Sequence, residues 1–182
     1  HRVDVVAIEG PLRMTWIDEE FPSFPTLDTD PFHDETLTVL RRVPTAGHVI
    51  VTVGPITNDI VPDHVRIDTA ILWAFKTSGG AVDWSAYEVL RLIESEHLDW
   101  LHWKTGGHWS IPGCADDETD YAIPELSSTG ASSTPRWAEL ISGPAFGKIL
   151  NADRSRAKRF ILRATAGNSI SFLSESGVNG AS

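Results

Sequence analysis

The sequence predicts a mainly β protein, an antiparallel β-sandwich of jelly-roll type with one inserted helix and a second short helix. Short segments in which bulky apolar residues alternate with polar ones recur along the chain, and Gly and Pro separate them at regular spacing. Alternating strand and helix units, which a doubly wound parallel sheet requires, are absent from the pattern. With 182 residues, 41% hydrophobic and 22% charged, we expect one folded domain spanning 1–182.

The first half of the chain contains most of the predicted strands. Alternation of apolar and polar side chains, ended by Gly or Pro, predicts strands at 3–8, 12–16, 36–43, 48–53 and 65–75. The last of these has Trp73 and Phe75 in line with four earlier odd-numbered residues, and its later half is apolar on both faces. It is therefore predicted as a central strand buried at one end. Segment 21–33, in which prolines alternate with aromatic and small polar residues, is expected to be an ordered surface loop.

The stretch that follows predicts a helix over about 85–97 and then an aromatic hairpin. Ser85 and Glu88 have the spacing of a capping box, in which each side chain bonds the backbone N–H of the other. Apolar residues then recur at the spacing of one helix face: Ala86, Val89, Leu90 and Ile93, with His97 one turn further. Thr105-Gly106-Gly107 supplies the turn residues of the hairpin.

The last third begins with a long polar connection over 113–130. Thr134 and Pro135 are typical of an N-cap and a first helical position, and Trp137, Leu140 and Ile141 form a short apolar face, so a helix is predicted over about 135–141. Segments 159–165 and 169–173 flank Ala166-Gly167-Asn168 and predict a terminal hairpin. Residues 176–182 are expected to form a loose tail.

Charge and composition limit the partners that this domain can have. A formal charge of -10 argues against nucleic acid or an anionic membrane surface as the main partner. A single cysteine, Cys114, allows no internal disulfide, and no apolar run approaches the roughly twenty residues of a membrane span. Because the chain begins at His1 and its one methionine is Met14, we expect a processed product or a piece excised from a longer chain, without a targeting segment of its own.

Four of the seven tryptophans lie between residues 84 and 109. Flat indole faces pair well with the apolar faces of sugars, so Trp100, Trp103 and Trp109 are candidates for a stacking platform, with Asp99 as a flanking hydrogen-bond acceptor. Core packing is the competing interpretation for any single tryptophan. With seven tryptophans in one modest domain, we expect at least one or two to reach the surface, where exposed aromatic side chains mark contact sites.

Metal and catalytic motifs give weaker indications. Asp116, Asp117 and Asp120 are the densest carboxylates and the first candidates for calcium, but they lack the spacing of a calcium loop, which favours a solvated acidic loop without a cofactor. His97, His102 and His108 fit neither a helix face nor a zinc-finger pair. Gly-x-Ser-x-Gly and His-Glu-x-x-His are both absent. No catalytic residue is predicted, and the balance favours a protein that is not an enzyme.

In general character the chain resembles the protruding domain of a small non-enveloped RNA-virus capsid protein. It is β-rich, acidic, rich in Ser, Thr, Pro and Trp, and has no internal disulfide. The resemblance rests on no diagnostic motif and carries over no individual residue. It implies a structural attachment domain on a virion surface or outside a cell, which self-associates and binds a host receptor or a glycan. The alternatives are a carbohydrate-binding module or carbohydrate-active enzyme with an aromatic cleft and, less favoured, a metal-dependent enzyme that uses the histidines.

Overall fold

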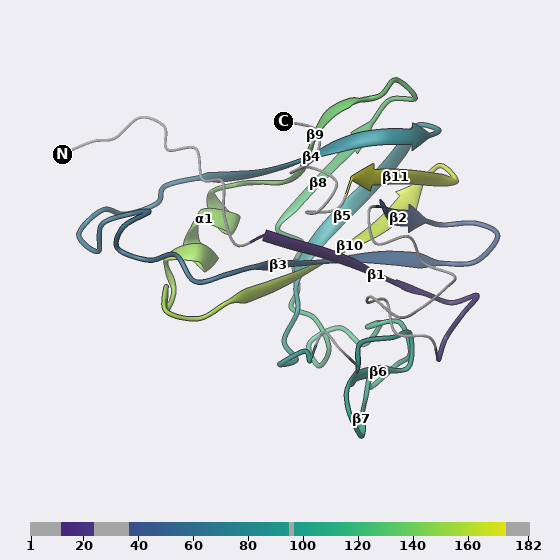
Figure 1. Cartoon of the computed structure of the whole chain (residues 1–182), viewed down its shortest axis with the longest axis horizontal. Helices are drawn as coiled ribbons and strands as arrows, with labels where there is room; N and C mark the ends of the chain where they lie inside the picture. The colour runs from purple at the N-terminus through teal and green to yellow at the C-terminus, as the bar shows by residue number, and fades with distance from the viewer. Residues whose placement is uncertain (1–11, 24–36, 95–96, 174–182) are drawn as a thin grey trace.

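The computed structural model describes residues 12–23, 37–94 and 97–173. This part of the chain is mainly β, as predicted, with an antiparallel sheet that nearly closes into a barrel and one helix, α1, Pro144–Asn151 (Figure 1). The predicted strand at 3–8, most of the predicted loop at 21–33 and the predicted tail at 176–182 lie outside the described residues. The strands are β1 Leu12–Asp18, β2 Leu37–Arg41, β3 Gly47–Val53, β4 Ala70–Gly79, β5 Val82–Glu88, β6 His102–Lys104, β7 Gly107–His108, β8 Ser127–Ala131, β9 Arg136–Gly143, β10 Lys158–Ala166 and β11 Ser169–Leu173.

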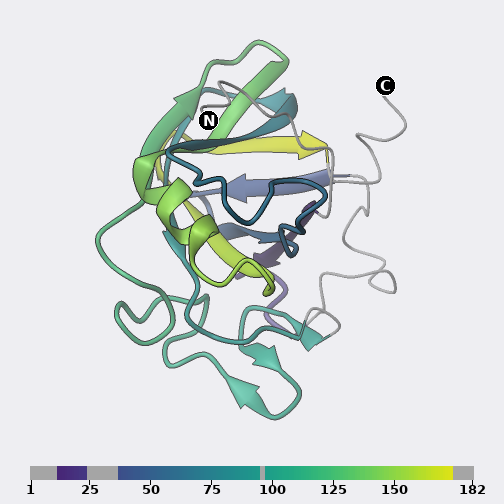
Figure 2. The same cartoon turned by 90° about the vertical axis from the view of Figure 1, so that its left-hand side faces the viewer.

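The main sheet has the strand order β8-β5-β10-β3-β2-β11-β4-β9, and β1 pairs with β3. A single residue pair, Arg41 with Gly47, joins β2 to β3. At the two ends of the order, β8 and β9 lie next to each other, and the Ser142 N–H donates to Ser127 Oγ at 3.2 Å. The sheet therefore nearly closes on itself, and α1 lies beside one end of it (Figure 2).

Most predicted strands are confirmed: β1, β2, β3, β10 and β11 match the predicted segments within a few residues, and β6 and β7 form the predicted hairpin. The predicted strand at 65–75 begins only at Ala70. Its first part is held by a side chain instead of a strand, because the Asn151 amide accepts from the Ile67 N–H at 3.0 Å and donates to the Ile67 carbonyl.

The predicted helix over 85–97 is wrong in the residues that the structure describes. Val82–Glu88 is strand β5, paired with β10 on one edge and β8 on the other, so the backbone hydrogen bonds are satisfied by neighbouring strands. Trp84 and Ala86 point into the barrel, and Ser85 Oγ bonds Ser128 Oγ at 3.2 Å instead of capping a helix. The apparent helical spacing arises because the strand ends at Glu88 and an irregular segment follows.

The predicted helix over 135–141 is also wrong, because residues 136–141 lie in β9, paired with β4. The ladder shifts between the pairs Leu72–Ile141 and Trp73–Glu139, which leaves Leu140 as an extra residue. This bulge turns two consecutive residues, Leu140 and Ile141, towards the core and imitates helical spacing. The real helix, α1, begins immediately afterwards, where Gly143 has a φ of 116° and Pro144 is the first helical residue.

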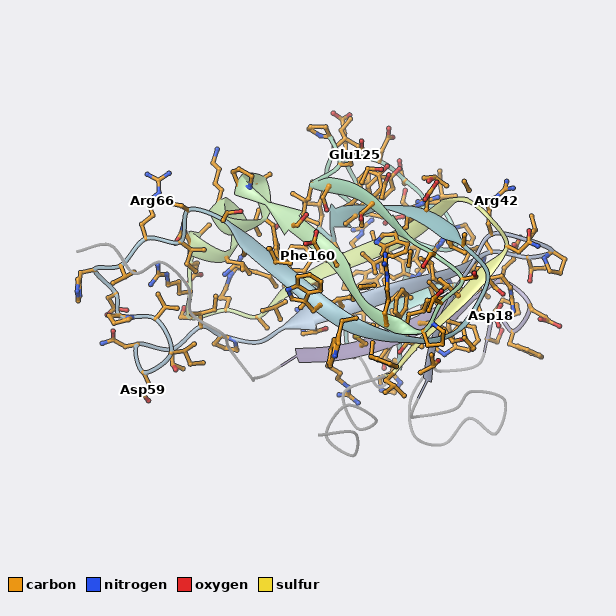
Figure 3. All side chains as sticks on the ribbon, turned by 90° about the horizontal axis from the view of Figure 1, so that it is seen from above. Asp18, Arg42, Asp59, Arg66, Glu125 and Phe160 are labelled. Atoms are coloured by element: carbon orange, nitrogen blue, oxygen red, sulfur yellow. The ribbon has the colours of Figure 1, made fainter. Side chains whose placement is uncertain are left out.

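The barrel interior is the larger of two hydrophobic clusters. Phe160, Trp84 and Phe172 are fully buried there, with the Trp84 and Phe172 rings edge to face at 5.7 Å. Seen from above, Phe160 lies in the middle of the molecule, whereas the charged residues Arg42, Asp59, Arg66 and Glu125 lie around the outside (Figure 3). Helix α1 closes part of this core with Phe146, whose ring meets Phe160 edge to face at 5.1 Å.

The second cluster lies on the outer face of β1, β3 and β10. It is covered by the long segment between β5 and β8, residues 89–94 and 97–126 in the described chain, which we call the insertion. Its β6–β7 hairpin projects below the sheet in Figure 1. The strands contribute Ile17, Ile50 and Ile161, and the insertion contributes Val89, Ile93, Leu98, Trp109 and Cys114.

Candidate functional site

The strongest candidate for a contact site is the outer face of β4 and β9, which we call the aromatic face. Cross-strand pairs point to the same side of a sheet, and the pairs here are Phe75 with Trp137 and Trp73 with Glu139. Trp73 is 46% exposed and Trp137 is 52% exposed. The face is made by Ile71, Trp73, Phe75, Trp137, Glu139 and Ser142.

Two contacts hold this face in place. The Phe75 ring meets the Trp137 ring edge to face at 5.6 Å, which fixes the orientation of the exposed indole. On the inner side of β4, the Lys76 side chain is fully buried, and its ammonium donates to the Gly79 carbonyl at 3.2 Å and to the Ser132 carbonyl. Burial lowers the pKa of Lys76, and Arg136 nearby lowers it further. The contact with Ser132 ties β4 to the turn that joins β8 and β9.

The three tryptophans of the predicted platform all lie in the insertion, where they cover the second cluster. Trp109 is buried, and its Nε1 donates to the Asp99 carbonyl at 3.0 Å. Trp100 is half-buried and packs against His48 with ring centroids 5.2 Å apart. Trp103 is half-buried, and the Lys104 ammonium lies 4.7 Å from its ring centroid. The sugar platform on these rings stays a prediction, and the structure gives each of them a packing role.

Asp99, the predicted flanking acceptor, organises the start of the β6–β7 hairpin. Its buried carboxylate accepts from the backbone N–H groups of Leu101 at 2.8 Å and His102 at 2.7 Å. His102 Nδ1 lies 2.9 Å from Asp99 Oδ1 and 3.1 Å from Oδ2. The carboxylate therefore fixes the backbone turn and the orientation of one imidazole.

The acidic residues proposed for calcium are not equivalent in the structure. Asp120 is fully buried and accepts from the N–H groups of Ser110 at 3.0 Å, Ile111 at 3.2 Å and Asp116 at 3.3 Å. The Arg91 guanidinium also donates to it at 3.1 Å. Asp116 accepts from the Ser110 hydroxyl, and Asp117 is exposed. These contacts make Asp120 the centre of the loop fold, and calcium binding stays a prediction.

Cys114 and His48, a candidate nucleophile and a candidate base, are both buried. Burial and the neighbouring Asp120 raise the pKa of the Cys114 thiol, which lies inside the second cluster. His48 is buried, and its Nδ1 has no hydrogen-bond partner within the described part of the chain. Burial, and secondarily Arg163, lowers the pKa of His48 to about 3. In the described residues, no group of three or more His, Cys, Asp and Glu side chains is arranged to hold a metal ion.

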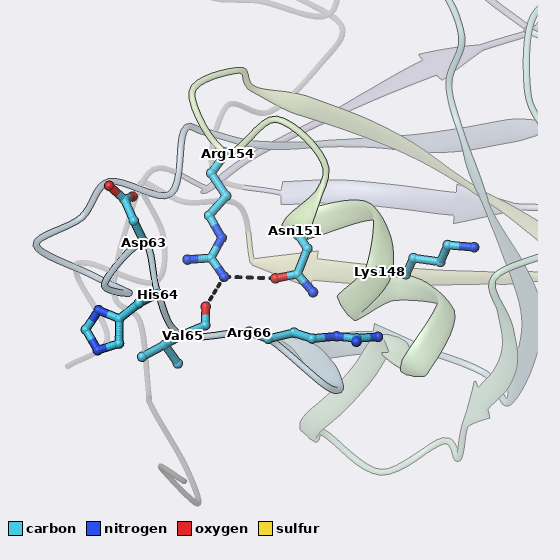
Figure 4. A pocket seen from close by; sticks show the side chains of 7 residues that line it. All are labelled: Asp63, His64, Val65, Arg66, Lys148, Asn151 and Arg154. Carbon is cyan, nitrogen blue, oxygen red and sulfur yellow. Dashed lines mark hydrogen bonds between the residues drawn. The ribbon is translucent and has the colours of Figure 1, made fainter. Parts of the chain in front are cut away.

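A basic surface pocket of about 400 Å³ lies between the 54–69 loop and α1, with Arg66, Lys148 and Arg154 in its wall (Figure 4). The Arg154 guanidinium already makes hydrogen bonds within the protein. It donates to the carbonyls of Pro62 at 3.0 Å and Val65, and to Asn151 Oδ1 at 2.9 Å. Arg154 therefore joins the loop to the end of α1, and the pocket offers a ligand fewer free cations than its composition suggests.

Sequence reasoning did not find the aromatic face. Trp73 was expected in a buried strand and Trp137 on a helix face, yet both are exposed on one sheet. One signal was available: Trp73 is in line with Ile71 and Phe75, whereas Ala74 and the charged Lys76 occupy the other side of the strand. Nothing in the pattern indicated that the charged side would face inwards.

No model of a known protein family matches the chain, and no curated protein matches it. Among the described residues, no helix has both the length and the apolar character needed to cross a membrane.

Proposed function

We propose that this protein is a non-enzymatic attachment domain that binds a glycan through the aromatic face. The observation that carries the proposal is the pair Trp73 and Trp137, each about half exposed on adjacent strands. Large aromatic side chains are enriched at contact sites, and grouped exposure of this kind has a free-energy cost that a bound partner removes.

The chemistry of the face suits a sugar. The C–H groups on one side of a pyranose ring are apolar and pack on the negative face of an indole. Sugar hydroxyls also need polar partners, and the Glu139 carboxylate lies opposite Trp73 in the ladder. Because the rings stand on paired strands, little side-chain and backbone freedom is lost when a ligand binds.

The broader expectations from the sequence are part of the same proposal. We place the domain on a virion surface or outside a cell, in the manner of a capsid protruding domain that engages a host receptor. We also assign the barrel to the jelly-roll sandwiches. The single Arg41–Gly47 pair supports this, because it divides the strand order into two groups, β1-β3-β10-β5-β8 and β2-β11-β4-β9.

Self-association through the aromatic face is the second candidate. Ile71 is exposed beside Trp73, so the face also has the apolar character of a dimer contact. A glycan and a second copy of the chain would bind the same residues. Measuring glycan binding and dimerisation separately in variants of these residues therefore distinguishes the two functions.

The test is a glycan array followed by titration of the best ligand into Trp73→Ala and Trp137→Ala. Each variant should bind at least about ten-fold more weakly, the loss expected for a central aromatic contact. Leu92→Ala, which removes an exposed apolar side chain from the insertion, is the matched control and should bind like the wild type.

Other outcomes would assign the function elsewhere. Glycan binding that survives both sheet variants but is lost in Trp103→Ala would move the site to the predicted platform. Glycan turnover would identify a carbohydrate-active enzyme. A dimer in sedimentation that Trp73→Ala converts to monomer, with no glycan bound, would favour self-association.

A further inference from the structure

We infer that the β6–β7 hairpin carries a binding site for a divalent transition metal, formed by the imidazoles of His102 and His108, with Cu²⁺ as the best-fitting ion. The site is separate from the aromatic face and does not depend on the proposed glycan binding. It is built by two cross-strand neighbours and one buried carboxylate.

The two rings already have the separation that a shared metal needs. His102 and His108 are paired across the hairpin, with ring centroids 4.4 Å apart and planes tilted by 48°. A metal–nitrogen bond of about 2.0–2.1 Å places the metal roughly 3 Å from each ring centre. Two rings bound at about 90° then have centres roughly 4.5 Å apart, as in the tetragonal geometry that Cu²⁺ and Ni²⁺ prefer.

Asp99 prepares His102 to be a ligand. Both carboxylate oxygens lie within 3.1 Å of His102 Nδ1, so Nδ1 donates its proton to Asp99 and Nε2 is the nitrogen left for a metal. Metal-binding histidines commonly donate their second nitrogen to a carboxylate in this way, which fixes the ring and increases its basicity. Asp99 is itself fixed by the N–H groups of Leu101 and His102, so the arrangement is present before any metal binds.

His108 is held through its backbone while its ring stays exposed. The Trp103 Nε1 donates to the His108 carbonyl at 2.9 Å, and the next residue, Trp109, is buried in the second cluster. In the described part of the chain, no side-chain hydrogen bond is made by the His108 imidazole, so its nitrogens remain available to a ligand.

The residues around His102 and His108 indicate which metal ion the site prefers. A surface pocket of about 210 Å³ lies on the His102 side of the pair, away from the His108 ring, and is also lined by His97, Asp99 and Lys104. The Lys104 ammonium lies over the Trp103 ring, 4.7 Å from its centroid. With two imidazole ligands and water in the remaining positions, the site should be exchangeable, and it should prefer Cu²⁺ to Ni²⁺ and Zn²⁺. Calcium and magnesium prefer oxygen ligands and should not compete.

The experiment uses the full chain with an acetylated amino terminus and no added histidine tag. CuCl₂, NiCl₂ and ZnCl₂ are each titrated by calorimetry, and amide signals are followed by NMR during addition of substoichiometric Cu²⁺. We expect one equivalent of Cu²⁺ to bind and its paramagnetic broadening to be confined to residues around 97–109. His108→Gln and His102→Gln should each weaken binding at least about ten-fold.

Two further variants separate a metal site from a structural role. Asp99→Asn should weaken Cu²⁺ binding about 10- to 100-fold through loss of the carboxylate partner, as for other second-layer groups at metal sites. His64→Gln removes an exposed histidine from the distant 54–69 loop and should bind Cu²⁺ like the wild type. Wild-type affinity in His108→Gln, whose exposed side chain is not needed for folding, would overturn the inference. So would the absence of stoichiometric Cu²⁺ binding.

Discussion

Strands β3 and β10 bury their inner face in the barrel interior and their outer face against the insertion. The structures that pack on these two faces differ in kind. Inside, apolar side chains such as Phe160 and Val51 pack against other strands and α1. Outside, Ile161 and Ile50 are covered by a segment whose only strands, among the described residues, are the short β6 and β7. The insertion is held by individual hydrogen bonds, from its backbone and from buried side chains, instead of a continuous ladder.

Asp120 and Asp99 show how the insertion is held. The Asp120 carboxylate accepts hydrogen bonds from three backbone N–H groups and from the Arg91 guanidinium. The Asp99 carboxylate accepts from two backbone N–H groups and contacts the His102 ring nitrogen. A sheet distributes its stability over many equivalent pairs, whereas this segment is held by scattered backbone hydrogen bonds, such as Ala122 N–H to the Glu88 carbonyl, and by two buried carboxylates. Removing one side chain from the barrel core should therefore destabilise the whole domain, whereas removing one carboxylate from the insertion should destabilise mainly the insertion.

The largest effect is expected from Phe160→Ala inside the barrel. Deleting a fully buried aromatic ring leaves a cavity and should lower the free energy of unfolding by about 3–5 kcal/mol. Because the ring contacts the centre of the sheet, barrel and insertion should lose stability together in urea denaturation. Leu92→Ala, at a side chain 71% exposed, is the control and should change stability by less than about 0.5 kcal/mol.

Asp120→Ala should cost about 2–4 kcal/mol, concentrated in the insertion. It leaves three N–H donors and Arg91 without their acceptor. Hydrogen exchange should accelerate at the Trp109 and Ser110 amides while the amides of β10 stay protected. The exposed neighbour Asp117→Ala should leave exchange unchanged. If the amides of β10 lost hydrogen-exchange protection to the same extent, the barrel and the insertion would unfold as one cooperative unit.

The pH dependence of stability tests how His48 is buried beneath the insertion. The pKa of His48 is about 3 when folded and about 6.5 when unfolded, so the unfolded chain binds the extra proton between these values. The stability that depends on neutral His48 is complete above about pH 6.5 and should decrease by about 2 kcal/mol on acidification to about pH 5. Urea midpoints of wild type and His48→Gln, measured at both pH values, isolate this contribution. A difference between them that does not change with pH would contradict it.

The barrel was largely predictable from the sequence because each strand repeats one simple signal. Alternation at β1, β3, β10 and β11 corresponds to one side chain in and the next out. The signal failed where a bulge broke the rhythm at Leu140, and where an apolar strand end ran into the irregular start of the insertion at Val89. Both places imitated helical spacing.

The candidate site was less predictable because exposure is decided by distant parts of the chain. Trp109 lies in polar, glycine-rich sequence and Trp73 in apolar sequence, yet Trp109 is buried by the insertion whereas Trp73 is left uncovered on β4. The buried role of Asp120 depends on Ser110 and Arg91, ten and twenty-nine residues away. No local pattern contains that information.

The smallest stability effect is expected at the aromatic face, where Trp137→Ala should cost about 1 kcal/mol and Trp73→Ala less. Both indoles are about half exposed, and Trp137 loses one edge-to-face contact with Phe75, worth about 0.5–1.5 kcal/mol. Urea denaturation of the two variants beside Phe160→Ala measures the contrast directly. A loss above about 3 kcal/mol would mean that these rings are structural. Near-wild-type stability together with lost binding would mean that the sheet keeps two tryptophans at its surface for contact, since folding does not require them there.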